Sequence, residues 1–156
     1  MNCAQGGASS RLVGFTVRYA GDAVHHLRAR CVTMAANGNW AGSFTEHGAV
    51  LTTGTGASTP VKTSSINQTC PRDHFVSGLR LYIGPDRIIR HVQPYCSRVQ
   101  PLSRPQPLRM RGMPSGGNWT STVLCPSHKP IGYGAQQSLT EAGLRRARLS
   151  CLETPE

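Results

Sequence analysis

The chain has 156 residues, which suits one domain with a sizeable core, and it lacks any apolar stretch of about 18 residues that would cross a membrane as a helix. Its formal net charge is +10 at pH 7, and Lys62 and Lys129 are its only lysines, so an arginine-rich surface should attract anions. Scattered glycine (17) and proline (11), with apolar residues in short alternating runs, favour strands and turns over helices.

The first predicted hairpin lies between Cys3 and Cys31. Residues Val13–Tyr19 alternate between apolar and polar side chains, which is the pattern of a half-buried strand. A turn with Gly21 and Asp22 follows, and a return strand ends at the second cysteine. We therefore expect two antiparallel strands here.

Two segments with weaker signals precede the next hairpin. Gly38–Phe44 has the pattern of a glycine turn leading into an aromatic strand. Leu51–Thr69 is rich in Thr, Gly and Ser, and it predicts either a long loop or loops that flank a short edge strand.

The second hairpin is predicted between Cys70 and Cys96. Its opening strand is Val76–Ile83, and its turn contains Asp86. A connector rich in Pro and Arg follows at Ser97–Met113, for which the same two loop alternatives hold.

The third hairpin is predicted within Cys125–Cys151. Its opening strand, Ile131–Ala135, has a weaker alternation, and its turn contains Glu141. Upstream of it, Gly117–Val123 echoes the earlier Gly38–Phe44 segment.

The return strands of the three hairpins match in spacing. Counting back from the last cysteine, apolar residues stand four and seven positions earlier in every copy, with a basic pair between them. The apolar residues are Leu27 and Val24, Val92 and Ile89, and Ala147 and Leu144, and the basic pairs are His25-His26, Arg90-His91 and Arg145-Arg146. We predict a single domain, residues 1–156, built from three repeats at about 1–36, 37–113 and 114–156.

The six cysteines stand at the two ends of each repeat, and this placement selects one pairing among the many that six cysteines permit. A cysteine that opens one strand and a cysteine that ends its hairpin partner lie close enough for a bridge. The predicted disulfides are Cys3–Cys31, Cys70–Cys96 and Cys125–Cys151. They imply an oxidising compartment, extracellular or periplasmic. Zinc is the competing use of these residues, but no CxxC or HxxxH spacing occurs, so we expect no metal and no cofactor.

The third copy carries a family resemblance. Gly116–Trp119, then Cys125-Pro126, then Leu144–Cys151 resembles the repeat of vitelline membrane outer layer protein I, and bacterial jacalin-like domains have a similar pattern. The resemblance implies an all-β fold of the β-prism I kind, with three antiparallel sheets around a pseudo-three-fold axis. The sugar-binding Gly-x-x-x-Asp loop of jacalins is not evident, because His25 stands four positions after Gly21. The resemblance therefore supports the fold more than a lectin-like ligand.

Two sets of residues are candidates for ligand binding. His25, His26, Arg90, His91, Arg145 and Arg146 would hold an anionic or hydroxyl-rich polymer, or they are polar edge residues that deter strand pairing between molecules. Trp40 and Trp119 would stack on sugar rings, or they pack in the core.

These features predict a secreted, non-catalytic recognition module that binds glycan or another anionic polymer on a cell surface. The alternative is a structural or protein-interaction domain of a larger secreted protein, with no sugar binding of its own. Nucleic acid fits less well, because aromatic residues are only 6% of the chain and none stands near the arginine clusters. No nucleophile elbow or evident pair of catalytic carboxylates is present, so we do not expect an enzyme.

Overall fold

A computed structural model describes residues 3, 9–20, 23–52, 63–85, 89–109, 117–120, 122–125, 131–136, 139–140, 143–144 and 148–151. Strands predominate among the described residues, which contain no α-helix, and this confirms the all-β prediction. Within these residues there is accordingly no helix that could span a bilayer.

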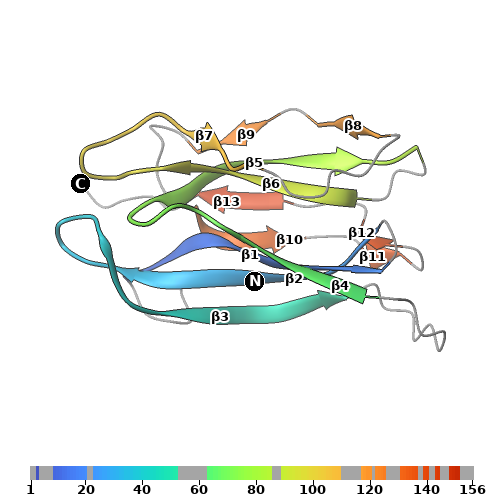
Figure 1. The fold of residues 1–156 in the computed structure, drawn as a ribbon, viewed down its shortest axis with the longest axis horizontal. Helices are drawn as coiled ribbons and strands as arrows, with labels where there is room; N and C mark the ends of the chain where they lie inside the picture. Colours follow the sequence, from blue (N-terminus) through green and yellow to red (C-terminus); the bar gives the residue numbers. More distant parts are fainter. Residues whose placement is uncertain are drawn as a thin grey trace.

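The first sheet has four antiparallel strands in the order β3-β2-β1-β4 (Figure 1). The strands are β1 (Ser10–Ala20), β2 (Ala23–Met34), β3 (Trp40–Thr52) and β4 (Thr63–Thr69). β1 and β2 form the first predicted hairpin, β3 pairs with β2, and β4 pairs with β1. The Thr-, Gly- and Ser-rich segment thus contributes an edge strand, the second of the two alternatives that its composition left open.

The second sheet is built around the second predicted hairpin. Its strands are β5 (Phe75–Ile83), β6 (Ile89–Ser97), β7 (Gln106–Pro107), β8 (Asn118–Trp119) and β9 (Val123–Leu124). β5 pairs with β6, β7 borders β6, and both β8 and β9 border β5. The sheet boundaries therefore differ from the predicted repeat boundaries, because β3 and β4 join the first hairpin and β8 and β9 join the second.

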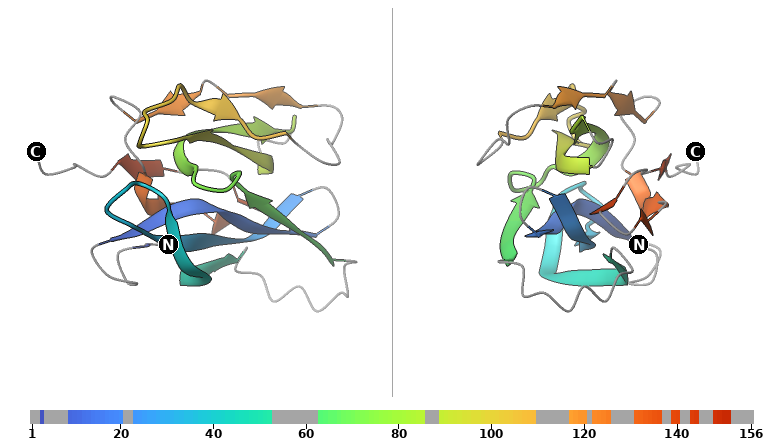
Figure 2. Two further views of the ribbon diagram at one scale, coloured as in Figure 1. Left: turned by 60° about the vertical axis from the view of Figure 1, so that its left-hand side comes forward. Right: turned by 90° about the vertical axis from the view of Figure 1, so that its right-hand side faces the viewer.

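The third hairpin consists of short strands. β10 (Ile131–Gln136) pairs with β13 (Arg148–Cys151), and β11 (Leu139–Thr140) pairs with β12 (Gly143–Leu144). β1, β5 and β10 contact one another pairwise, and β2 contacts both β6 and β12. In the end-on view (Figure 2, right) the second sheet lies at the top, the first at the bottom, and the third hairpin at the right. The opening strands of the three hairpins thus meet inside the molecule.

The core lies between these hairpins. Its buried side chains come from β1, β2, β5 and β6: Leu12, Phe15, Val17, Val24, Leu27, Ala29, Val76, Leu79, Ile89 and Val92. The predicted alternation explains most of them, since every second side chain of a strand faces the same way. Burial of this apolar surface is the main force that holds the hairpins together.

A β-bulge explains the spacing of the return strands. In the first hairpin, His26 pairs with Arg18 and Val24 pairs with Tyr19, so His25 is an extra residue. The extra residue places Val24 on the same face as Leu27, three positions on, and both are buried. Arg90 is the extra residue at the same point of the second hairpin. The basic pairs therefore mark a bulge in both hairpins.

A second register shift recurs in all three hairpins. The cross-strand partner of the last cysteine is Leu12, Val76 or Ile131. In each hairpin the next residue of the opening strand has no partner on the return strand. The similarity between the copies is thus present in the backbone as well as in the sequence spacing.

Two of the predicted disulfides are confirmed. Cys3–Cys31 and Cys70–Cys96 each have a Cα–Cα distance of 5.7 Å. Cys125 is also disulfide-bonded, but the side chain of Cys151 lies outside the described residues, so that pairing stays a prediction.

The Cys70–Cys96 bridge connects two sheets. The Cys70 amide, directly after β4, donates to the Val13 carbonyl of the first sheet at 2.8 Å, whereas Cys96 belongs to β6 of the second sheet. In the same way the Cys125 amide, directly after β9, donates to the Ser77 carbonyl of the second sheet at 2.8 Å. The disulfide therefore ties the edge of one sheet to the hairpin of the next.

Candidate functional site

The face of the first sheet that points away from the core carries polar and aromatic side chains. In β2 the buried Leu27, Ala29 and Cys31 alternate with half-buried Arg28 and Arg30, so the two arginines project on the opposite face. We call this surface the outer face. It consists of Thr16, Arg28, Arg30, Phe44, Glu46, Asn67 and Thr69.

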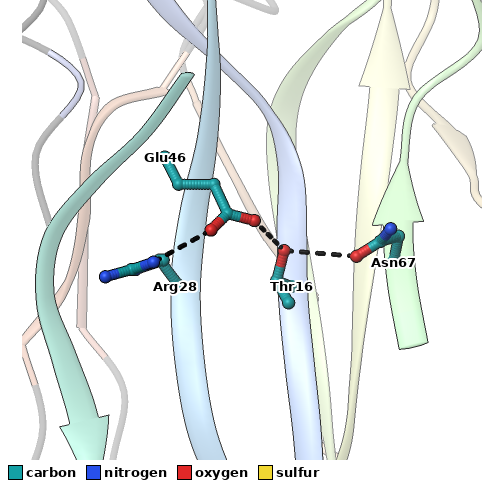
Figure 3. Close-up of polar contacts among 4 residues, drawn as sticks. All are labelled: Thr16, Arg28, Glu46 and Asn67. Atoms are coloured by element: carbon teal, nitrogen blue, oxygen red, sulfur yellow. Dashed lines mark hydrogen bonds and ion pairs between the residues drawn. The ribbon is translucent and has the colours of Figure 1, made fainter. Parts of the chain in front are cut away.

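One row of side chains crosses all four strands (Figure 3). Glu46 on β3 accepts a hydrogen bond from Thr16 Oγ1 at 2.6 Å, and it forms an ion pair with Arg28 Nη1 at 3.0 Å. Thr16 Oγ1 also lies 3.2 Å from Oδ1 of Asn67 on β4. A hydroxyl carries a single proton, so the contact with Asn67 is satisfied when its amide turns the NH2 group toward Thr16.

A second row is built around Arg30. Its guanidinium lies 4.6 Å from the centroid of the Phe44 ring, and Nη1 donates to Thr69 Oγ1 at 2.6 Å. Gly14 of β1 stands between Arg30 and Thr69 in the register of the sheet. A Cβ atom at Gly14 would meet the Gln68 carbonyl oxygen and would lie 2.7 Å from the Thr69 Cα. Glycine at this position lets β4 approach closely and lets the arginine cross β1.

The electrostatics of the outer face depend on Glu46. The hydrogen bond from Thr16 is the main cause that lowers the pKa of this carboxyl, and the hydrogen bond and charge of Arg28 and the charge of Arg30 act in the same direction against desolvation. The carboxylate is therefore charged near neutral pH and compensates one of the two arginines. Among the described side chains of the outer face, one positive charge remains in excess.

Only part of the basic pairs predicted from the sequence lies in the described residues, so their joint role in binding stays a prediction. Arg90 is half-buried at its bulge, and only the backbone of His25 and His26 is described. Arg145 and Arg146 lie outside the described residues.

His91 requires a correction. We expected it at the surface, but it is 1% exposed and offers no contact to a polymer in solution. Its cross-strand neighbour is Tyr82, which is itself buried and packs edge-to-face with Trp119 at 5.1 Å between ring centroids. Aromatic side chains therefore cover this end of the second sheet.

The two tryptophans are not structurally equivalent, although their sequence contexts match. Trp40 pairs with β2, the return strand of its hairpin, whereas Trp119 pairs with β5, an opening strand. The half-buried Trp40 packs against the core, and its Nε1 donates to the His74 carbonyl at 2.7 Å. The Trp119 ring is covered by Arg80, whose guanidinium lies 4.1 Å from the centroid.

The outer face was not predicted from the sequence. The alternation of Arg28 and Arg30 with buried residues was a visible signal, since it is typical of a strand with one solvated face. Glu46 and Phe44 join these arginines only because β3 pairs with β2, and no short motif indicates that pairing.

The part of the chain that the structure describes contains no group of three or more His, Cys, Asp or Glu side chains that could hold a metal ion.

Comparison of the chain with protein families, with curated proteins and with solved structures gave no match.

Proposed function

We propose that the protein is a secreted, non-catalytic recognition module that binds an acidic glycan or a related polyanion of a cell surface through the outer face of the first sheet. The observation that carries this proposal is the pair of hydrogen-bonded rows across four strands, in which Arg30 is held between Phe44 and Thr69. The disulfides are compatible with an extracellular location.

The chemistry of the outer face suits such a ligand. Guanidinium groups bind carboxylate and sulfate through paired hydrogen bonds, and the Thr16, Asn67 and Glu46 side chains suit sugar hydroxyls. Phe44 is 43% exposed and offers an apolar ring to the carbon face of a pyranose. Beyond the face itself, the net charge of +10 would attract a polyanion at a distance and make the association rate depend on salt.

We also propose that the whole chain is one domain of the β-prism kind. The pairwise contacts of β1, β5 and β10 and the shared register shift support this arrangement. In such a prism the apolar faces turn inward and each sheet presents one face to solvent, as the first sheet does with its arginines.

A glycan array at low and high salt tests the binding function. Wild-type protein should bind sulfated or uronate-rich glycans, and Arg28→Gln with Arg30→Gln should weaken this binding about tenfold or more. Arg104→Gln with Arg109→Gln is the matched control, because these exposed arginines lie on the connector and the charge change is the same. A blank array for wild type, or an equal loss in the control, contradicts recognition by the outer face.

A protein-interaction role is the second candidate, and β9 favours it. Val123 and Leu124 are 56% and 44% exposed on this edge strand. Exposed apolar edge strands are favourable sites for strand addition by another chain. If this role is correct, a partner captured in pull-downs should be lost with Val123→Lys, whereas Arg28→Gln should retain it.

A further inference from the structure

Arg80 lies on the second sheet in a setting similar to that of Arg30. It stands between Leu79 and Leu81, which contact the core, so its side chain projects from the opposite face of β5. The guanidinium stacks 4.1 Å from the Trp119 centroid, and Nε donates to Gln93 Oε1 at 2.5 Å. Gln93 is itself held by a bond from Nε2 to the Leu108 carbonyl at 2.8 Å.

Trp119 therefore lies against one face of the Arg80 guanidinium, and Gln93 binds the guanidinium at its Nε edge. The remaining donors are on Nη1 and Nη2, and neither makes a hydrogen bond to another described residue. Two acidic residues are described, and both are engaged elsewhere: Glu46 with Arg28, and Asp73 with the Trp40 amide at 2.9 Å. Within the described residues, the charge of Arg80 is therefore not compensated by a carboxylate.

We propose that Arg80, stacked on Trp119, is a second anion site that binds a carboxylate or sulfate group through both Nη atoms. This inference rests on the proposed function, since it assigns the second site to the same acidic glycan. Stacking on an aromatic ring holds the guanidinium plane, so little conformational freedom is lost on binding. The planar pair of donors then matches the two oxygens of a carboxylate or sulfate.

The two sites would make the molecule bivalent. In each, an arginine of a hairpin stacks on an aromatic ring of the neighbouring strand: Arg30 on Phe44 of β3, and Arg80 on Trp119 of β8. A long polyanion that occupies both sites gains affinity through effective concentration, which a short fragment that reaches one site does not.

The first experiment uses inorganic sulfate as the probe, with sodium chloride balancing the ionic strength, and follows the indole N–H resonances by NMR. The chain has two tryptophans, and the resonance of Trp119 should shift saturably; Trp40 packs on Phe44 and reports on the site at Arg30 instead. Arg80→Gln should abolish the shift, and Arg80→Lys should abolish most of it because an ammonium lacks the planar fork. Arg104→Gln, which removes an exposed connector arginine, should retain it.

An unchanged Trp119 resonance in wild type overturns the proposal, as does a full response in Arg80→Lys, which would reduce the effect to charge alone. Dispersed amide spectra of each variant establish that it is folded, and the Lys variant keeps the charge and the methylene stem of the arginine.

The second experiment measures affinity for a sulfated, uronate-containing octasaccharide. Arg80→Gln should weaken binding about tenfold relative to Arg104→Gln, and a ratio under about twofold overturns the second site while the proposed function stands. If wild type does not bind the octasaccharide and the sulfate response of Trp119 persists, the proposed function fails and the anion site at Arg80 stands.

Discussion

Glu46 occupies the centre of the outer face, where Thr16 and Arg28 both donate to its carboxylate. The lowered pKa means that the folded state holds the charged form more strongly than the unfolded chain does. The resulting stability is fully present above the ordinary pKa of 4.5 and is lost as the pH falls through the lower folded value.

Replacement of Glu46 should therefore change the acid limb of the stability curve. We expect Glu46→Gln to reduce the free energy of unfolding at neutral pH by up to about 1 kcal/mol, because the pair is partly exposed, and to have a smaller effect below pH 4.5. Urea unfolding from pH 3 to 7 measures the difference.

Thr16→Val should raise the pKa of Glu46 in a carboxyl-carbon NMR titration. An unchanged pKa would show that the Thr16 hydroxyl is not the main cause of the lowered pKa.

The basic pairs show what sequence reasoning can and cannot recover at the scale of residues. Their recurrence was detected correctly, but in the first two hairpins it coincides with a bulge, where an extra residue is needed whatever its chemistry. His91 is buried, and its cross-strand neighbour Tyr82 is nine positions away in the sequence, so strand pairing rather than sequence proximity brings the two together. Spacing therefore revealed the backbone feature, whereas exposure required the tertiary structure.

At the scale of elements, the bulges decide which side chains enter the core. Arg90 is the extra residue that allows Ile89 and Val92 to face the same side. Without it, Ile89 would turn to the outer side and lose its burial.

Deletion of Arg90 should accordingly cost more than its substitution. We expect the deletion to lower the free energy of unfolding by about 2–5 kcal/mol, comparable to loss of a buried isoleucine side chain, whereas Arg90→Ala should cost about 1 kcal/mol or less. Urea denaturation of the two variants makes the comparison. Equal stability of the two would show that the extra residue does not set the register.

Gly14 offers a second test within the first sheet. An added methyl group would collide with the backbone of β4, so Gly14→Ala should destabilise the fold by about 1–3 kcal/mol or more. Gly42 provides the contrast, because it has a positive φ of +76° but nothing lies within 4 Å of an added Cβ atom. Gly42→Asn should cost less than about 1 kcal/mol, because Asn tolerates the left-handed region. Thermal unfolding distinguishes them, and a tolerated Gly14→Ala would mean that β4 can move away.

At the scale of the whole molecule, one disulfide connects two sheets. The Cys70–Cys96 bridge spans 26 residues and connects the end of β4 to β6. Removing this bridge increases the conformational entropy of the unfolded chain, and it also releases the edge of the first sheet from the second hairpin.

The double variant Cys70→Ala with Cys96→Ala should lose about 3–4 kcal/mol of stability by the chain-entropy estimate. Amide hydrogen exchange should accelerate in β4 more than in β2, because among the described strands β4 is bordered by β1 alone. Cys3→Ala with Cys31→Ala is the matched control, since its separation of 28 residues predicts a similar loss without the selective change in β4. Uniform acceleration in both variants would contradict a local role for the bridge.

Much of this architecture could be predicted from the sequence. Alternation located the three hairpins, and the cysteine spacing gave two confirmed disulfides. The partners of the hairpins could not be predicted, because β3, β4, β8 and β9 attach through backbone hydrogen bonds that carry little side-chain signature. The outer face depends on this pairing and was missed for the same reason.

The recurring bulge has a practical consequence for engineering. The hairpins share the number of residues between the bulge and the final cysteine rather than the identities of those residues. A combinatorial library that keeps this count and the inward positions, while randomising Thr16, Arg28, Arg30 and Glu46, should still yield folded clones. The chain would then serve as a small display scaffold whose binding specificity is changed on one face of the first sheet.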